Sequence, residues 1–425
     1  MPRRPGAIGS LTRVADEITR RLGRRAPLVV ASTRQAGDAA RERVGDVEHV
    51  RVAPGLERAL LAAWYRTRNR VARRLGVAER HFAASPLYYR RWIRGVAREL
   101  AAARPALVHL HNVSQFLRPL RRAMPDAALV LQMHCDWLVE LPRTVVAPRL
   151  AAADLVLGVS RHVADGVAAA FPAVAPRCRV LHNGVDLADF PPRARVRAER
   201  AGEVAALRAR HRLGTPVVLY VGRLSSEKGV HVLVAAFGRF RARRRDATCV
   251  LVGPDWGPIR KVRSPGGDPL ADEVARLDRD YMGCLRALAA PHGDRVVFAG
   301  TVPNADLAVW HAAADVLVAP SLCEAFGIPV IEAGASELPV VATGIGGLRD
   351  TVTHERTGLV VPPADPGALA DALERLAAAP DLGRTLGEAA RRRVAAEFTW
   401  DAVVDRLAGY YDELLVPRGA AGLAG

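Results

Sequence analysis

Residues 217–229 of this chain read VVLYVGRLSSEKG, an apolar run followed by a glycine turn and basic side chains. The run has the length and β-branched content of a strand buried on both faces. Gly222 and Gly229 allow tight backbone turns, and a helix that begins after such a turn presents free N–H groups to an anion. Arg223 and Lys228 add two cations. The stretch therefore predicts a diphosphate site at the end of a parallel strand.

Lysine is rare in this chain, which makes its position informative. Of the 61 basic residues only two are lysine, Lys228 and Lys261. Arginine thus serves almost wherever a cation is needed, and a lysine at a strand-to-helix turn indicates that a compact ammonium is wanted there. The alternative is that Arg223 and Lys228 are ordinary surface charges.

A second motif, VLVAPSLCEAFGIPVIE at 316–332, also follows an apolar run. It carries Glu324 in a loop and Glu332 inside a helix expected to begin near Phe326. At 1.5 Å per residue Glu332 lies roughly 9 Å beyond that helix start. Carboxylates accept paired hydroxyls, so the two can hold the ends of an extended polyhydroxylated ligand. The alternative is a structural ion pair around a buried carboxylate.

Apolar runs alternate with Arg/Ala-rich helical stretches along the whole chain, which predicts parallel sheets covered on both faces, an α/β fold. Two series of strands are joined by the polar stretch 191–212, which we interpret as the domain boundary. Since ligands of such sheets bind at the carboxyl ends of strands, the site is expected in the cleft between the two domains. The predicted strands are 28–31, 106–111, 128–134, 155–159, 179–182, 217–221, 249–252, 296–299, 316–319 and 340–343.

Length and composition agree with two globular domains. The chain has 425 residues, half of them apolar and a quarter charged. It contains no run of roughly 20 apolar residues and no apolar stretch typical of a secretory signal near its start. Its five cysteines are scattered without a C-x-x-C pair, which favours a reducing cytoplasm over a disulfide framework or a zinc site.

The net charge of +17 is carried entirely by the first half. Residues 1–200 hold 35 Lys+Arg against 17 Asp+Glu, whereas residues 201–425 hold 26 against 27. Arginines are densest at 64–98, where aromatic residues are interleaved with them. An anionic membrane surface at the inner face or an acidic acceptor would fit this pattern, and so would a general bias towards arginine on solvated faces. No recognised binding motif accompanies the charge, so nucleic acid is not expected as a partner.

Three histidines lie near the ends of two predicted strands. His109 and His111 share one face of the first strand, and His134 ends the second. A metal cluster is one interpretation, but no further His or Asp completes it in a recognisable spacing. Histidines that pack in the core are another interpretation, and for His134 contact with a bound sugar is a third.

Taken together, these motifs resemble glycosyltransferase family 4, whose members have the two-domain GT-B fold. The G-R-x5-K-G stretch at 222–229 and the E-x7-E stretch at 324–332 match, as do HNGVD at 182–186 and VLGVS at 156–160. The closing FTW at 398–400 resembles the start of a terminal helix that crosses back to the first domain. The resemblance covers most of the chain and is strongest from about residue 106 to residue 400.

The resemblance implies a domain arrangement and a reaction. Residues 1–195 would form an acceptor-side Rossmann-like domain, 196–397 a nucleotide-sugar-binding one, and 398–425 the returning helix and tail. The expected activity is retaining transfer of a hexose from a nucleotide-diphosphate sugar, with UDP as the expected nucleotide, to an acceptor that the sequence does not identify.

The resemblance also assigns roles to single residues. Catalytic roles fall on His134, Glu324, Arg223 and Lys228, and donor binding on Gly6, Gly9, Gly222, Arg223, Lys228, Glu324, Phe326, Gly327 and Glu332. In detail, Arg223 and Lys228 would hold the diphosphate and Glu332 the ribose hydroxyls. Glu324, with backbone N–H groups around Phe326 and Gly327, would contact the donor sugar. His134 would lie near the transferred sugar, and Gly6 and Gly9 would form a loop against donor and acceptor.

No metal or other cofactor is expected, because two cations and helix N-termini can stabilise the leaving diphosphate and no D-x-D-type motif follows a strand. By resemblance, the leaving phosphate takes the acceptor proton in a front-side transfer. Three other functions stay open: a nucleotide-sugar epimerase of the same fold, a pyridoxal-dependent phosphorylase, which only two lysines disfavour, and a basic membrane- or nucleic-acid-binding protein.

Two segments depart from the family pattern. Gly6 stands almost at the start, whereas the family's glycine loop follows a central strand, and a sheet that lacks a central strand leaves backbone groups unpaired. We therefore expect either a start assigned too late or an unusual first sheet. Residues 255–268 are expected to be an insertion after the strand at 249–252, without an assigned role.

Overall fold

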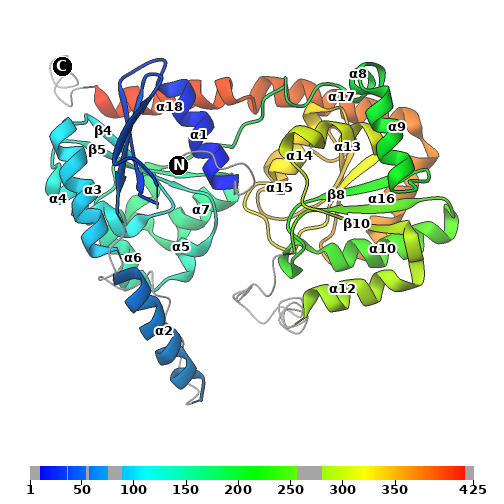
Figure 1. The fold of residues 1–425 in the computed structure, drawn as a ribbon, viewed down its shortest axis with the longest axis horizontal. Helices are drawn as coiled ribbons and strands as arrows, with labels where there is room; N and C mark the ends of the chain where they lie inside the picture. Colours follow the sequence, from blue (N-terminus) through cyan, green and yellow to red (C-terminus); the bar gives the residue numbers. More distant parts are fainter. Residues whose placement is uncertain (1–9, 36, 54–56, 75–88, 256–279, 417–425) are drawn as a thin grey trace. The chain divides into compact units, whose positions relative to one another are not determined.

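The computed structural model describes residues 10–35, 37–53, 57–74, 89–255 and 280–416, and it divides into two compact units (Figure 1). Unit 1 comprises residues up to His182 together with those from Val403 on, and unit 2 comprises Asn183–Ala402. The last helix therefore begins in unit 2 and continues in unit 1. The domain limits expected at 195 and 397 stay a prediction.

Unit 1 contains two separate sheets in the described part of the chain. One has the order β1-β3-β2, with β1 parallel to β3 and β2 antiparallel to it, and the other is the parallel sheet β4-β5-β6-β7. Its elements are α1 (Ser10–Leu22), β1 (Leu28–Thr33), β2 (Arg41–Val44), β3 (Val47–Val52), α2 (Glu57–Arg74), α3 (Arg90–Ala103), β4 (Leu107–His111), α4 (Leu117–Ala123), β5 (Ala128–Met133), α5 (Trp137–Glu140), α6 (Arg143–Leu150), β6 (Leu155–Gly158), α7 (Arg161–Ala170), β7 (Cys178–Val180) and α18 (Trp400–Leu415).

The described strands of unit 1 form two sheets, and this does not decide between a start assigned too late and an unusual first sheet, so both stay predictions. Strands β1 and β4 each stand at the end of their sheet, so each has a ladder partner on one side only in the residues described. Strands β2 and β3 were not predicted, because their sequences RERV and VEHVRV mix charged with apolar residues and are not continuous apolar runs.

Unit 2 is built around a six-stranded, all-parallel sheet with the order β10-β9-β8-β11-β12-β13. Helices α10 and α12 cover one face and α13 and α14 the other (Figure 1). Its elements are α8 (Arg193–Glu199), α9 (Ala201–Arg210), β8 (Val217–Val221), α10 (Val230–Arg243), β9 (Thr248–Val252), α12 (Tyr281–Ala289), β10 (Val296–Gly300), α13 (Leu307–Ala313), β11 (Val316–Ala319), α14 (Ile328–Ala335), β12 (Val340–Thr343), α15 (Leu348–Thr351), β13 (Leu359–Val361), α16 (Pro366–Ala378) and α17 (Pro380–Glu397).

The predicted α/β class with parallel sheets is confirmed. Each predicted strand is present with ends shifted by no more than two residues. The central strands β5, β6, β8, β9, β11 and β12 are buried along most of their length, which is why they are continuous apolar runs in sequence. The short β13 was missed, because three apolar residues do not stand out in sequence.

The polar stretch 191–212 is not an extended connection but forms α8 and α9 in unit 2. Three of its arginines bind the carboxyl end of α13: Arg193 and Arg197 donate to the Ala314 carbonyl, and Arg208 donates to that of Ala313. Cations at a helix C-terminus satisfy carbonyls that have no partner within the helix. These arginines are thus structural rather than merely solvated.

Candidate functional site

The strand order of unit 2 contains a switch point between β8 and β11. The chain runs outward from β8 through β9 to β10, and then returns to continue outward from β11 through β12 to β13. Strands β8 and β11 are neighbours, with Val218 opposite Val316 and Leu219 opposite Leu317. Both sequence motifs follow these two strands directly. In open parallel sheets, this position outside the carboxyl ends is where ligands bind.

The loop after β8 is shaped by its glycines. A Cβ on Gly222 would lie 2.7 Å from the Tyr220 hydroxyl, which donates a hydrogen bond of 2.7 Å to the Arg223 carbonyl. Gly229 has φ +63° and precedes α10, and a Cβ there would lie 2.0 Å from the Pro320 carbonyl oxygen. These positions accept only glycine, because the backbone either approaches a neighbour closely or takes the left-handed conformation.

The two motif loops are joined by backbone hydrogen bonds. The Glu227 carbonyl accepts from the Leu322 amide at 2.8 Å and from the Cys323 amide at 3.1 Å. This pairing, together with the close approach at Gly229, fixes the turn after β8 against the loop after β11. It places Lys228 beside Glu324.

Each of the two cations in the first motif is paired with a carboxylate. The Lys228 ammonium donates to Glu324 Oε2 at 2.7 Å, and both side chains are about 16–17% exposed. Ser321 Oγ donates to the same Glu324 oxygen at 3.3 Å. The Arg223 guanidinium lies 3.2 Å from Glu227 and is 40% exposed. Lys228 and Glu324, which the resemblance assigns to the diphosphate and to the sugar, are therefore direct neighbours.

A glycine-rich loop after β12 completes this part of the site, and sequence reasoning missed it. The Gly347 amide donates to the Glu324 carbonyl at 2.9 Å, and a Cβ on Gly346 would lie 2.1 Å from that oxygen. Gly344, Gly346 and Gly347 follow directly after the predicted strand at 340–343. That clustering of glycines after a strand was the signal that could have found the loop.

The second carboxylate of the E-x7-E motif is deeply buried. Glu332 is 3% exposed and lies in α14, which begins at Ile328, two residues later than predicted. Gly327, with φ +96°, turns the chain into this helix. Phe326 is 2% exposed and packs edge-on against Phe398 at 6.0 Å between ring centroids. The Phe326 side chain thus belongs to the core, and only its backbone is open to a role in binding.

His134 lies in unit 1, directly after β5. Its backbone N–H donates to Asn112 Oδ1 at 2.7 Å, and its Nε2 is 3.0 Å from His111 Nδ1. Burial, with a smaller contribution from His111, lowers the pKa of His134 to about 3, and burial lowers the pKa of His111 to about 4. Both imidazoles are therefore neutral at pH 7. Within the described residues no group of three or more His, Cys, Asp or Glu side chains is arranged to hold a metal ion.

Two further motifs of the sequence pair with each other in unit 2. Val185 of HNGVD and Thr399 of FTW form a parallel bridge, in which the Val185 amide donates to the Phe398 carbonyl at 2.8 Å. A Cβ on Gly184 would lie 2.6 Å from the Trp400 ring. Their role seen here is to join the start of unit 2 to its end. Gly6, Gly9 and residues 256–268 of the predicted insertion lie outside the described residues.

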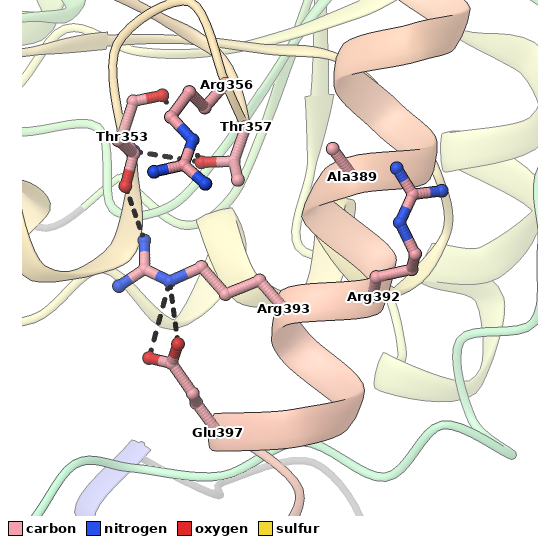
Figure 2. Close-up of a pocket in the computed structure, with 7 residues that line it drawn as sticks. All are labelled: Thr353, Arg356, Thr357, Ala389, Arg392, Arg393 and Glu397. Atoms are coloured by element: carbon pink, nitrogen blue, oxygen red, sulfur yellow. Dashed lines mark hydrogen bonds and ion pairs between the residues drawn. The ribbon is translucent and has the colours of Figure 1, made fainter.

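A depression of about 570 Å³ in unit 2 does not coincide with the switch point (Figure 2). It lies between α17 and the loop after α15. One of the cations that line it, Arg393, donates to Thr353 Oγ1 at 3.1 Å and to the Asp350 carbonyl at 2.6 Å, and pairs with Glu397 at 3.3 Å. Arg393 thus serves to fasten α17 to this loop. None of the residues lining the depression belongs to the motifs.

Comparison with known proteins identifies the class. Residues 11–189 match the model of glycosyltransferase family 4, and residues 206–393 match that of glycosyl transferases group 1. The chain belongs to family 4 of the glycosyltransferases, and its fold is the GT-B fold. Both were predicted from the motifs and are confirmed.

Particular relatives differ in what they make. The chain is 30% identical to an alpha-maltose-1-phosphate synthase of Mycolicibacterium smegmatis over 77% of its own length and 79% of that protein. It is 34% identical to a GDP-mannose-dependent alpha-(1-6)-phosphatidylinositol monomannoside mannosyltransferase of Mycobacterium tuberculosis, over 60% and 61%. The structure of sucrose-phosphate synthase from Thermosynechococcus elongatus has a TM-score of 0.67, with 26% identity and 96% and 94% coverage.

The described helices are also too short or too polar to span a membrane.

Replacing Gly229 by alanine should destabilise unit 2. The left-handed conformation costs a non-glycine residue about 1–2 kcal/mol, and the clash with Pro320 adds to that. We expect a lower Tm in thermal unfolding followed by circular dichroism. Gly202→Ala is the matched control: Gly202 lies in α9, has no atom within 4 Å of an added Cβ, and should be neutral or slightly stabilising. Equal Tm values for the two variants would contradict the close-approach argument.

Proposed function

We propose that this glycosyltransferase moves a hexose, with retention of configuration, from a nucleotide-diphosphate sugar to an acceptor, with no metal ion required. The observation that carries the proposal is the ion pair of Lys228 with Glu324 beside the switch point between β8 and β11, where Arg223 of the same loop pairs with Glu227. A relative that depends on GDP-mannose supports a nucleotide-diphosphate donor. The sequence-based expectation is a UDP donor, so both nucleotides belong in the test.

In this mechanism the bond between C1 of the sugar and the diphosphate oxygen breaks as the acceptor oxygen bonds to C1 from the same face. The acceptor proton passes to the leaving phosphate. Negative charge grows on the diphosphate, and Arg223 and Lys228 stabilise it. Glu324 sits beside Lys228 at 2.7 Å, so the pair can bind the phosphate with the ammonium and the sugar hydroxyls with the carboxylate.

Two further residues are assigned to the donor, Glu332 to its ribose and His134 to its sugar. Glu332 would accept hydrogen bonds from the two ribose hydroxyls, and His134 of unit 1 would contact the transferred sugar.

The first test is a transfer assay with UDP-, GDP- and ADP-hexoses in the presence of EDTA. Activity should persist without divalent metal, and Lys228→Ala should lower kcat/KM by about 30- to 1,000-fold, the equivalent of about 2–4 kcal/mol of transition-state stabilisation. Arg243→Ala is the control, since Arg243 is an exposed cation paired with Asp371 at 2.9 Å. Unchanged turnover in Lys228→Ala, or activity restored only by magnesium or manganese, would overturn the proposal. An epimerase would instead release free nucleotide or invert a stereocentre of the sugar in an assay that contains no acceptor.

The two glutamates should fail in different ways. Glu332→Gln should weaken binding of the free nucleoside diphosphate, because the amide accepts fewer hydrogen bonds from ribose. Glu324→Gln should bind the nucleotide nearly as wild type but transfer more slowly. Isothermal calorimetry and initial rates measure the two effects separately. Wild-type nucleotide affinity in Glu332→Gln would remove Glu332 from the ribose site.

A peripheral contact with an anionic surface is a second proposal, supported by α2 alone. Leu60, Trp64 and Val71 are 68%, 57% and 50% exposed. At 100° per residue these three positions fall within about 40° of one another, so they form one apolar stripe. Arg66 and Arg70 are exposed on the same helix.

The other aromatic residues of the arginine-rich region do not join this stripe. Tyr89, Trp92 and Phe116 pack together in unit 1, with ring centroids 5.3–6.1 Å apart. The Trp92 indole N–H donates to the Val52 carbonyl at 3.0 Å. Phe82 and Tyr88 lie outside the described residues. Of the arginine- and aromatic-rich binding surface expected over residues 64–98, the described residues therefore leave only α2 as a candidate.

Vesicle sedimentation tests the α2 stripe. The protein should pellet with phosphatidylcholine vesicles that contain phosphatidylglycerol at low salt, and less at high salt, because each basic residue near such a surface contributes about 1 kcal/mol. Trp64→Glu should reduce pelleting. Leu288→Glu, which changes an exposed residue of α12, should not. Equal pelleting of both variants, or none by wild type, would count against the membrane contact.

A further inference from the structure

Two residues at the end of β4 form hydrogen bonds with His134. Strand β4 pairs with β5 in a register that places His111 opposite Gln132, and the Asn112 backbone N–H donates to the Gln132 backbone carbonyl at 2.8 Å. Asn112 Oδ1 then accepts from the His134 backbone N–H, at 2.7 Å, while His111 Nδ1 meets His134 Nε2, at 3.0 Å. Two consecutive residues thus hold the main chain and the ring of the same histidine.

The backbone conformation of Asn112 allows these two hydrogen bonds to form. Asn112 has φ +61°, in the left-handed region that non-glycine residues seldom occupy. Asparagine tolerates it better than most, but such a conformation is kept only where the surrounding contacts determine it. Here it ends the strand directly after His111 and brings the Asn112 amide group to the main chain of His134.

A row of rings extends from His134 to the last helix. The His111 ring stacks on that of His109, with centroids 4.6 Å apart and planes at 19°, and lies 5.3 Å from that of His134. His109 Nδ1 is 2.6 Å from the hydroxyl of Tyr411 in α18. Tyr411 thus holds His109, which stacks on His111, and the whole row belongs to unit 1.

A neutral imidazole carries its proton on one nitrogen only, and the hydrogen bond at one nitrogen decides which. Because burial keeps both rings neutral at pH 7, one ring donates and the other accepts: the His134 proton is on Nδ1 if His111 donates, and on Nε2 if His134 donates. The described residues make no hydrogen bond to His134 Nδ1, so this nitrogen is available to a ligand hydroxyl.

We propose that His111 is a positioning residue, which fixes the ring plane and tautomer of His134 through the Nδ1–Nε2 hydrogen bond so that His134 Nδ1 meets the transferred sugar. This inference rests on the proposed function for its catalytic consequence. The fixed tautomer itself does not depend on any substrate.

The test combines side-chain ¹⁵N NMR with kinetics. In ¹⁵N-histidine-labelled protein, the His134 signals, assigned by their loss in His134→Asn, should show one tautomer. His111→Phe keeps a ring of similar size but removes the hydrogen bond, and should shift the His134 signals towards the average of two tautomers. His111→Asn places an amide where Nδ1 stood and should restore the single tautomer.

Kinetics follow the same order. His111→Phe should lower kcat by about 10- to 100-fold with donor KM little changed, as expected for a misplaced group, and His111→Asn should recover most of the loss. His49→Phe, which changes a histidine of β3 in the other sheet, is the control and should change neither readout.

The outcomes separate cleanly. His134 signals unchanged in His111→Phe would overturn the positioning role. So would equal losses of Tm and activity in His111→Phe and His111→Asn, because that result indicates packing alone. If no nucleotide sugar is turned over by wild type, the proposed function fails, while the NMR arm still decides whether His111 sets the tautomer of His134.

Discussion

The candidate donor site depends on the contact between the turn that ends at Gly229 and the loop that begins at Pro320. The two loops follow the strands on either side of the switch point, where the parallel sheet leaves its carboxyl ends uncovered. Glycine at 229 lets the backbones touch, and the Glu227 carbonyl binds two amides of the second loop. This contact between the loops holds Lys228 next to Glu324.

The pairing of Lys228 with Glu324 changes how the two motifs are understood. In sequence they are separate devices, one cationic for phosphate and one acidic for hydroxyls. In the structure Lys228 and Glu324 form one zwitterionic pair. The Ser321 hydroxyl donates to the Glu324 carboxylate, and the Gly347 backbone N–H donates to the Glu324 backbone carbonyl. A ligand that carries both phosphate and hydroxyl groups matches such a pair better than either group alone.

Arginine has several different roles in this chain, and composition could not separate them. Arg193, Arg197 and Arg208 bind the carbonyls at the end of α13, whereas Arg223 lies at the switch point and Arg66 stays exposed on α2. Among the described arginines of the first half, Arg193 and Arg197 bind carbonyls while Arg66 stays exposed, so they do not share one role. Only the environment of each guanidinium shows whether it caps, pairs or faces solvent.

The sequence by itself determined the α/β class, the family and the two motifs, because buried parallel strands are continuous apolar runs and the glycine and charge spacings are local. Tertiary structure alone decided that Lys228 touches Glu324, that the loop at 344–347 supports it, and that His109, His111 and His134 form a row ending at Tyr411. It also decided that the described strands of unit 1 form two sheets. These features join residues far apart along the chain, and which strands become neighbours is set by how the whole sheet packs rather than by any local pattern.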